Sequence, residues 1–254
     1  MIILLSPAKS LKLQTPAVSI KPTIPAFLQD SKKLVDNLKK LSVGDLEKLM
    51  VISLKLAELN WKRFQDFSLP FDNKYSHPAL FLFDGDVYKS MTISGYDKKD
   101  LDFAQNHLRI LSGLYGVLKP LDLMQEYRLE MGTKTKAILE KTLPEFWQKK
   151  IADCVNDELE NQHEKTIINL ASEEYFAAIN SAKIKGRIIN IIFKEQKGKD
   201  YKIIGLFAKK ARGLMADFII KNKIKKSEDL QEFSVEKYRF RKEFSNQNNW
   251  HFCR

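Results

Sequence analysis

The stretch RIINIIF, residues 187–193, sets the expected fold class because its apolar side chains do not alternate with polar ones. Five of its seven residues are Ile or Phe, and they fall on both faces that a strand would have. A strand that is apolar on both faces belongs to a sheet covered on both sides. Similar runs occur at IILL (2–5), ALFLF (79–83), RILS (109–112), TIINLA (166–171) and KIIGLFA (202–208).

Helical patterns separate these runs, and they predict helices over 26–41, a short segment after Ser42, 53–67, 97–107, 144–161 and 209–223. Strands interspersed with helices predict an α/β fold with a mixed or mostly parallel central sheet and helices on both faces. We expect one domain over residues 1–254. Ligands of such sheets gather at the carboxyl ends of the strands, so we expect the functional residues to follow the strands.

The composition limits which classes of protein the chain can belong to. No apolar run approaches the ~20 residues that a membrane helix needs, so we expect no membrane partner. The start, MIILLSPAKS, lacks a basic segment before its short apolar run, which favours a strand over a signal peptide. The two cysteines, Cys154 and Cys253, match no metal spacing and form no disulfide framework. A reducing cytoplasm is therefore the expected compartment.

The net charge of +11 resides in one part of the chain. Residues 1–177 hold 24 basic and 24 acidic residues, whereas residues 178–254 hold 19 basic and 8 acidic residues. A basic C-terminal third favours a polyanionic partner, most simply nucleic acid. The alternative is a lysine-rich genome, because 35 of the 43 basic residues are Lys.

Polar residues follow two of the predicted strands. Ser6 and Lys9 follow the strand at 2–5, and their hydroxyl and ammonium groups suit a phosphate or a carboxylate. Ser172 follows the strand at 166–171 and is a plausible helix N-cap. A capping role would explain Ser172 but not why Asn169 and Tyr175 occur beside it. These residues, with Ser6, are therefore secondary candidates for a site in the same cleft.

The segment AKKARG places Lys209, Lys210 and Arg212 in the first turn of the helix predicted over 209–223. Cations at a helix N-terminus oppose the macrodipole, and Gly213 costs about 1 kcal/mol relative to Ala inside a helix. An anion bound by the helix N-terminus and the three cations would resolve this conflict. The alternative is that the lysines extend into water.

The segment LSGLYGVLKPLDLMQEYRLEMG, residues 111–132, permits two interpretations. In one, a helix at 97–111 leads into a helix-hairpin-helix whose glycines bring backbone N–H groups to a phosphate. In the other, 109–112 is a central strand, Tyr115 stands in a cleft, and Arg128 returns from a following helix to face the same cavity as Lys9. Both interpretations give the same candidates for anion binding: Ser112, Gly113, Tyr115, Gly116, Lys119, Tyr127 and Arg128.

The sequence lacks G-x-S-x-G, Walker and G-x-G-x-x-G motifs, so we expect no cofactor and assign no catalytic residue. Asp84 and Asp86 flank a glycine and could hold Mg²⁺, although Asp-Gly is ordinary turn chemistry. We therefore expect no metal site. The polar loops after the strands leave one alternative open, namely an enzyme that acts on a nucleotide or a nucleic-acid base in a cleft at the sheet carboxyl ends.

Several segments together resemble the YaaA family of bacterial cytoplasmic peroxide-stress proteins along the whole chain. They are SPAKSL (6–11), ISLKLAELNWKRF (52–64), GDVY (85–88), LRILSGLYGVLKPLDLMQEYRLEMG (108–132), NLASEEYF (169–176) and AKKARGLMADFI (208–219). The family usually has Arg where this chain has Lys119, so the charge is kept but a bidentate phosphate contact is lost.

The resemblance implies an α/β fold peculiar to the family, a helix-hairpin-helix-like element and binding of double-stranded DNA through a positively charged cleft. It also implies resistance to hydrogen peroxide through limiting the damage from unincorporated iron, and it implies no agreed reaction. No cluster of His, Asp and Glu at ligand spacing is visible in the sequence, so we expect any effect on iron to be indirect. We expect a monomer.

Overall fold

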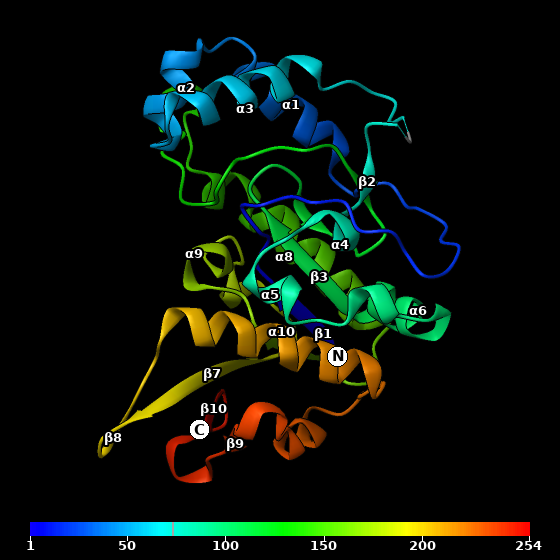
Figure 1. Cartoon of the computed structure of the whole chain (residues 1–254), viewed down its shortest axis with the longest axis vertical. Helices are drawn as coiled ribbons and strands as arrows, with labels where there is room; N and C mark the ends of the chain where they lie inside the picture. The colour runs from blue at the N-terminus through cyan, green and yellow to red at the C-terminus, as the bar shows by residue number, and fades with distance from the viewer. Residues whose placement is uncertain (73) are drawn as a thin grey trace.

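The computed structural model describes residues 1–72 and 74–254, which fold around one central sheet (Figure 1). The strand order is β4 (Gly116–Leu118), β3 (Leu108–Ser112), β1 (Ile2–Leu5), β6 (Thr166–Asn169), β7 (Arg187–Lys197), β10 (Asn249–Cys253) and β9 (Arg239–Phe240), and β8 (Asp200–Lys202) pairs with β7. A separate antiparallel pair joins β2 (His77–Pro78) to β5 (Leu123–Met124).

The five central strands run parallel, which confirms the predicted α/β class with a mostly parallel sheet. Strand β1 pairs with β3 and with β6, β6 pairs with β7, and β7 pairs with β10, all in parallel register. The antiparallel pairs lie at the margins: β3–β4, β7–β8 and β9–β10. The carboxyl ends of β1, β3 and β6 therefore lie at one edge of the sheet.

Helices surround the sheet, and three of them form a separate group at one end of the molecule (Figure 1). That group is α1 (Leu28–Leu38), α2 (Val43–Met50) and α3 (Leu54–Asp66). The other long helices are α6 (Lys98–His107), α8 (Leu143–Glu160) and α10 (Gly205–Lys221), and the short ones are α4 (Ala79–Leu82), α5 (Asp86–Lys89), α7 (Lys136–Leu139) and α9 (Glu173–Phe176). Five 3₁₀ turns span Ile93–Gly95, Ser181–Lys183, Ser227–Glu232, Val235–Lys237 and Lys242–Phe244.

Capping residues explain where several helices begin. The Ser42 hydroxyl accepts a hydrogen bond from the backbone N–H of Asp45, whose carboxylate accepts the Ser42 N–H in return. Asp97 with Asp100 forms the same reciprocal cap at α6. Such capping boxes satisfy backbone donors that a helix start leaves free. The predicted short helix after Ser42 is thereby confirmed.

Two predicted strands are wrong. The run at 79–83 forms helix α4 instead, and all four of its residues are buried. A short, fully apolar run fits a buried helix as well as a buried strand, so its pattern could not separate the two. The run at 202–208 contains only the end of β8, and α10 begins at Gly205. Its Ile203 and Leu206 are 61% and 51% exposed, so this run is not a core strand.

One continuous cluster of buried apolar side chains extends from Met1 to Phe252 and packs around the sheet. All four residues of β1 and all five of β3 are buried, as strands covered on both faces should be. The expectation of a single domain stays a prediction. In the described part of the chain, residues 1–72 and 74–254, no helix is long and apolar enough to span a membrane.

Candidate functional site

The loops that follow β1 and β6 meet at the carboxyl edge of the sheet. The Ser6 hydroxyl lies 3.2 Å from the Ser172 hydroxyl and accepts a hydrogen bond of 2.8 Å from the Ser172 backbone N–H. The phenol of Tyr88, from α5, donates to the Ser6 carbonyl at 2.9 Å. The sequence placed Ser6 and Ser172 together correctly, and their hydroxyl groups are engaged with each other.

The segment after β3 is a β-hairpin and not a helix-hairpin-helix. Strand β3 turns at residues 113–115 and pairs with β4 in antiparallel register, Ser112 opposite Gly116. Gly116 has φ +71°, and a Cβ there would meet the Trp147 ring at 2.7 Å. A Cβ on Gly113 would lie 2.2 Å from the Leu129 carbonyl oxygen. These glycines therefore permit close packing in the core, and the strand interpretation of 109–112 is confirmed.

Tyr115 is fully buried, so the prediction that it stands in a cleft is wrong. Its phenol oxygen accepts a hydrogen bond of 3.0 Å from the Gln125 backbone N–H. The Ser112 hydroxyl is also buried, and it lies 2.6 Å from the Tyr127 phenol. Leucines 111, 114, 118, 121 and 123 are buried around the hairpin. The hydroxyl groups of this hairpin therefore stabilise the core.

The segment that carries Tyr127 and Arg128 does not return from a helix, because residues 125–130 are irregular. Arg128 donates to the Glu130 carboxylate at 2.8 Å, and the Lys9 ammonium pairs with the same carboxylate at 2.6 Å. Arg128 and Lys9 thus face a common pocket, as predicted, and Tyr115 does not line it. Glu130 was not among the predicted site residues, although it lies within the segment 111–132 as a carboxylate two positions after an arginine.

We call this pocket the edge pocket and define it by Lys9, Tyr127, Arg128, Glu130 and Tyr175. Its volume of about 10 Å³ matches a single water molecule at most. Burial raises the pKa of both Tyr127 and Tyr175, so both phenols are neutral at pH 7. The edge pocket therefore holds two cations against one carboxylate and has no space for a nucleotide base.

Asn169 and Lys119 lie outside the edge pocket. The Asn169 side chain donates to the Asn190 side-chain oxygen at 2.8 Å and accepts from the backbone N–H of Ala171, so it ties β6 to β7. Lys119 lies 3.3 Å from Glu158, which also holds Arg109 near the start of β3. Because Ser112 ends β3, Lys119 is at the opposite edge of the sheet from the edge pocket.

Helix α10 begins four residues before its predicted start, at Gly205, and this changes the interpretation of its cations. Lys209, Lys210 and Arg212 lie in its second turn, away from the backbone N–H groups of the N-terminus. The predicted clash with the macrodipole is therefore wrong. Gly213 is also accounted for, because a Cβ there would meet the Val87 carbonyl oxygen at 1.9 Å. It lets α10 approach α5 closely.

We call Lys209, Lys210 and Arg212 the α10 basic face. Both lysines are exposed and Arg212 is half-buried. Among the described residues 1–72 and 74–254, none of the three side chains has a carboxylate within ion-pair distance or a hydrogen-bond acceptor. Burial lowers the pKa of the Arg212 guanidinium, and the nearby Glu173 opposes this shift. A charged group in that setting gains from a bound anion.

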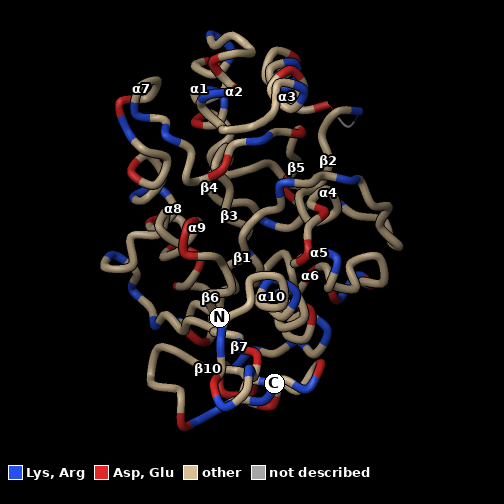
Figure 2. The backbone as a smooth tube through the Cα atoms, turned by 60° about the vertical axis from the view of Figure 1, so that its left-hand side comes forward, with Lys and Arg blue, Asp and Glu red and all other residues tan. Residues whose placement is uncertain are grey.

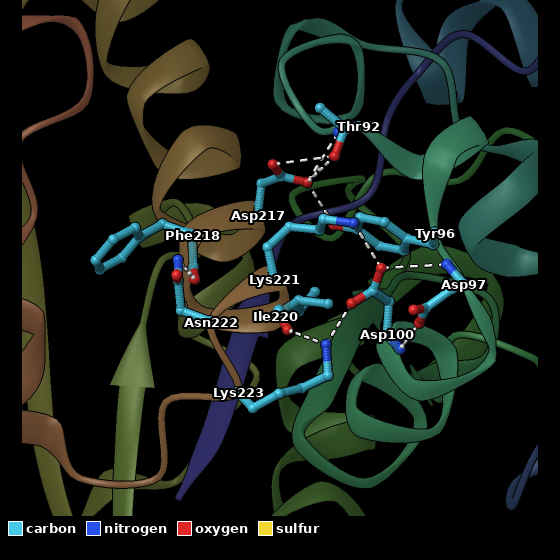
Figure 3. Close-up of polar contacts among 10 residues, drawn as sticks. All are labelled: Thr92, Tyr96, Asp97, Asp100, Asp217, Phe218, Ile220, Lys221, Asn222 and Lys223. Atoms are coloured by element: carbon cyan, nitrogen blue, oxygen red, sulfur yellow. Dashed lines mark hydrogen bonds and ion pairs between the residues drawn. The ribbon is translucent and has the colours of Figure 1, made fainter.

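A polar network fixes the C-terminal half of α10 (Figure 3). The Asp217 carboxylate accepts hydrogen bonds from the Thr92 backbone N–H at 2.8 Å and from the Tyr96 phenol at 2.6 Å. The buried Asp100 carboxylate of α6 pairs with Lys221 at 2.7 Å and also with Lys223. These contacts hold α10 to α6, so the helix presents its basic face from a fixed position.

No group of three or more His, Cys, Asp and Glu side chains in the described residues could hold a metal ion. Asp84 lies 3.3 Å from the Lys89 ammonium. Figure 2 shows basic and acidic positions interleaved along most of the backbone. Many exposed lysines among the described residues also lack an acidic partner. The distinguishing residue of the α10 basic face is Arg212, the only one of the eight arginines, in the part of the chain that the structure describes, whose side chain has neither an ion pair nor a hydrogen-bond acceptor.

The chain is similar to a known protein family and to several relatives along most or all of its length. The family described as "peroxide stress protein YaaA" matches residues 1–244. A UPF0246 protein of Saccharophagus degradans is 48% identical over 100% of this chain and 99% of its own length. A UPF0246 protein of Acaryochloris marina is 46% identical over the full length of both chains. One from Aliivibrio fischeri is 46% identical over 94% of this chain and 93% of its own.

Proposed function

We propose that this chain, which belongs to the peroxide stress protein YaaA family, binds double-stranded DNA through the α10 basic face. The observation that supports this proposal is the half-buried Arg212, whose side chain has neither an acidic partner nor a hydrogen-bond acceptor among the described residues 1–72 and 74–254, beside the two exposed lysines Lys209 and Lys210. Duplex DNA carries one negative charge per ~1.7 Å of its axis, so it suits such a face. The excess of basic residues over 178–254 would add a long-range attraction.

In this proposal the protein acts in the cytoplasm as a monomer and limits damage from unincorporated iron indirectly, by covering DNA. An indirect effect agrees with the lack of a three-ligand metal cluster among the residues that the structure describes. The alternative, an enzyme that acts on a base, has less support. The edge pocket, of about 10 Å³, leaves no space for a base. The larger cavity that shares Glu130 with it, of about 630 Å³, is lined by none of the predicted site residues.

The test is duplex binding measured by fluorescence anisotropy between 50 and 200 mM salt, a range over which several phosphate contacts cost affinity steeply. The variant Lys209→Gln/Lys210→Gln should bind on the order of 10-fold more weakly or worse, and its salt slope should fall by about 2 because two phosphate contacts are lost.

The matched control is Lys225→Gln/Lys226→Gln, which removes the same charge just beyond the other end of α10 from two exposed lysines. It should bind nearly as well as the wild type. Equal losses in the two variants would show that net charge alone matters, and no binding by the wild type at 50 mM salt would overturn the proposal. The same protein, purified anaerobically without a tag, should carry no stoichiometric iron.

A further inference from the structure

Strands β7 and β8 form a hairpin that extends beyond the sheet. Strand β10 pairs with β7 only as far as Lys194, opposite Cys253, whereas β8 pairs with β7 from Glu195 to Lys197. We call residues 195–202 the β-arm. Buried positions of β7 end at Phe193, so the β-arm has no core face. Figure 1 shows it projecting from the body of the molecule, on the side where α10 begins.

The β-arm carries lysines that have no acidic partner. Lys197, Lys199 and Lys202 are exposed, and none of them has a carboxylate within ion-pair distance among the residues described, 1–72 and 74–254. Two carboxylates lie in the β-arm. Glu195, at its base, pairs with Arg254 at 2.9 Å and accepts from the Tyr238 phenol. Asp200 stands opposite Lys197 in the β7–β8 register, but it forms no ion pair within the part of the chain that the structure describes. The β-arm therefore presents three available cations.

Exposed apolar side chains join the β-arm to the α10 basic face. Ile203 is 61% exposed and Leu206 is 51% exposed, and they lie in the sequence between Lys202 and Lys209. Phe244, whose ring is tilted by 59° against that of Tyr201 with ring centroids 5.6 Å apart, is 43% exposed. Large apolar side chains flanked by unpaired lysines form a surface suited to a partner that offers both negative charge and nonpolar groups.

We propose that the β-arm is a DNA-contacting element that lies in the major groove of a duplex whose backbone also contacts the α10 basic face. This inference rests on the proposed function and adds a second DNA contact to that of the α10 basic face. Two hydrogen-bonded strands are about 5 Å apart, and a ribbon of this width enters the major groove, which is about 12 Å wide. The three lysines would contact the phosphates along the groove, and Ile203 and Leu206 would face sugars and base edges.

Lysines on an edge strand also have a structural use, because they prevent strands of two molecules from pairing. That use predicts dimers or aggregates when the lysines are neutralised, with DNA binding unchanged. The DNA-contact role predicts the opposite: weaker binding and an unchanged oligomeric state. The two roles are therefore separable by one set of variants.

The experiment compares Lys197→Gln/Lys199→Gln/Lys202→Gln with a control, Lys99→Gln/Lys225→Gln/Lys226→Gln. The control removes the same charge from exposed lysines near the other end of α10, a helix about 25 Å long. Duplex affinity of the β-arm variant at 100 mM salt should fall on the order of 100-fold, and its salt slope should fall by 2 to 3, since about three phosphate contacts are lost. All replaced side chains are exposed, so both variants should melt like the wild type.

A second duplex, with glucosylated hydroxymethylcytosine filling its major groove, tests the placement of the β-arm. It should reduce wild-type affinity toward that of the β-arm variant and leave the variant itself little changed. Equal wild-type affinity for both duplexes would overturn the major-groove placement. If the wild type binds and the β-arm variant matches its control, the β-arm inference fails and the proposed function stands; if the wild type does not bind, both fail.

Discussion

The edge pocket and the α10 basic face both contain cations from the segments that first suggested an anion site, yet they differ in how those cations are neutralised. In the edge pocket, Lys9 and Arg128 share the carboxylate of Glu130. On the α10 basic face, Lys209 and Lys210 have no such partner among the described residues 1–72 and 74–254. Basic residues in a motif are therefore candidates for anion binding only where the fold leaves them unpaired.

The largest expected effect concerns Gly213, which tests whether the glycine of the segment AKKARG is there for packing. In Gly213→Ala the new methyl would overlap the Val87 carbonyl oxygen, at 1.9 Å. We expect the free energy of unfolding to fall by about 3 kcal/mol, the upper end for overpacking. Denaturant unfolding followed by circular dichroism measures this loss.

The control is Gly205→Ala on the same helix, where no atom lies within 4 Å of a new Cβ. Because Ala is a better helix former than Gly, this variant should gain up to about 1 kcal/mol. If the two substitutions have equal effects on stability, Gly213 is not a packing residue. The distinction between the packed side of α10 and its exposed basic face then fails.

The next prediction concerns the ion pairs of Asp100 with Lys221 and Lys223, which hold α10 against α6. We call these pairs the anchor of α10. Asp100→Asn removes the charge that holds Lys221 and Lys223, and should cost about 2 kcal/mol because the carboxylate is buried. Asp102→Asn, which breaks only the exposed pair with Lys98, should cost less than about 1 kcal/mol. Similar losses in both variants would contradict the anchor.

The pH dependence of unfolding gives a second measure of the same anchor. Burial opposes ionisation of Asp100, but hydrogen bonds from Lys221 and Lys223 outweigh it, so its pKa in the folded state is lowered. A carboxyl group with a lowered folded pKa stabilises the fold above its unfolded pKa of about 4, and this contribution is lost as the pH falls through the folded pKa. Unfolding of Asp100→Asn should therefore depend less on pH between about 5 and 2 than that of the wild type.

The sequence predicted the sheet well because an unalternated strand such as 2–5 can be stable only when both faces are covered, and all of β1 is buried. For 187–193 the expected cover is incomplete, because buried positions 189, 191 and 193 of β7 alternate with half-buried ones. It misjudged 79–83, where a short apolar run fits a buried helix equally well, and it misplaced the start of α10, since the apolar Ile203 and Leu206 are exposed. For the site, it placed Lys9 with Arg128 correctly. It could not show that Tyr115 is buried, because a tyrosine beside glycines suits a cleft and a packed hairpin alike.

The last prediction, with the smallest change in affinity, concerns Glu130. Its substitution should make the edge pocket resemble the α10 basic face. Glu130→Gln removes the only carboxylate that pairs with Lys9 and Arg128 in the described part of the chain, 1–72 and 74–254. With both cations released, duplex affinity at 50 mM salt should rise about 3- to 10-fold and the salt slope should steepen by about 1, if one further phosphate contact forms. The measurement is the same anisotropy titration.

The matched control is Glu126→Gln, which removes an equal charge from the ion pair with Arg63. Arg63 and Glu126 line a different cavity, beside Lys74 and His77, so this variant should gain only the small effect of net charge. If Glu130→Gln and Glu126→Gln bind alike, the pairing of cations in the edge pocket does not govern DNA binding. If Glu130→Gln binds more weakly than the wild type, Glu130 itself supports the binding surface, and the pairing rule drawn from the two regions is wrong.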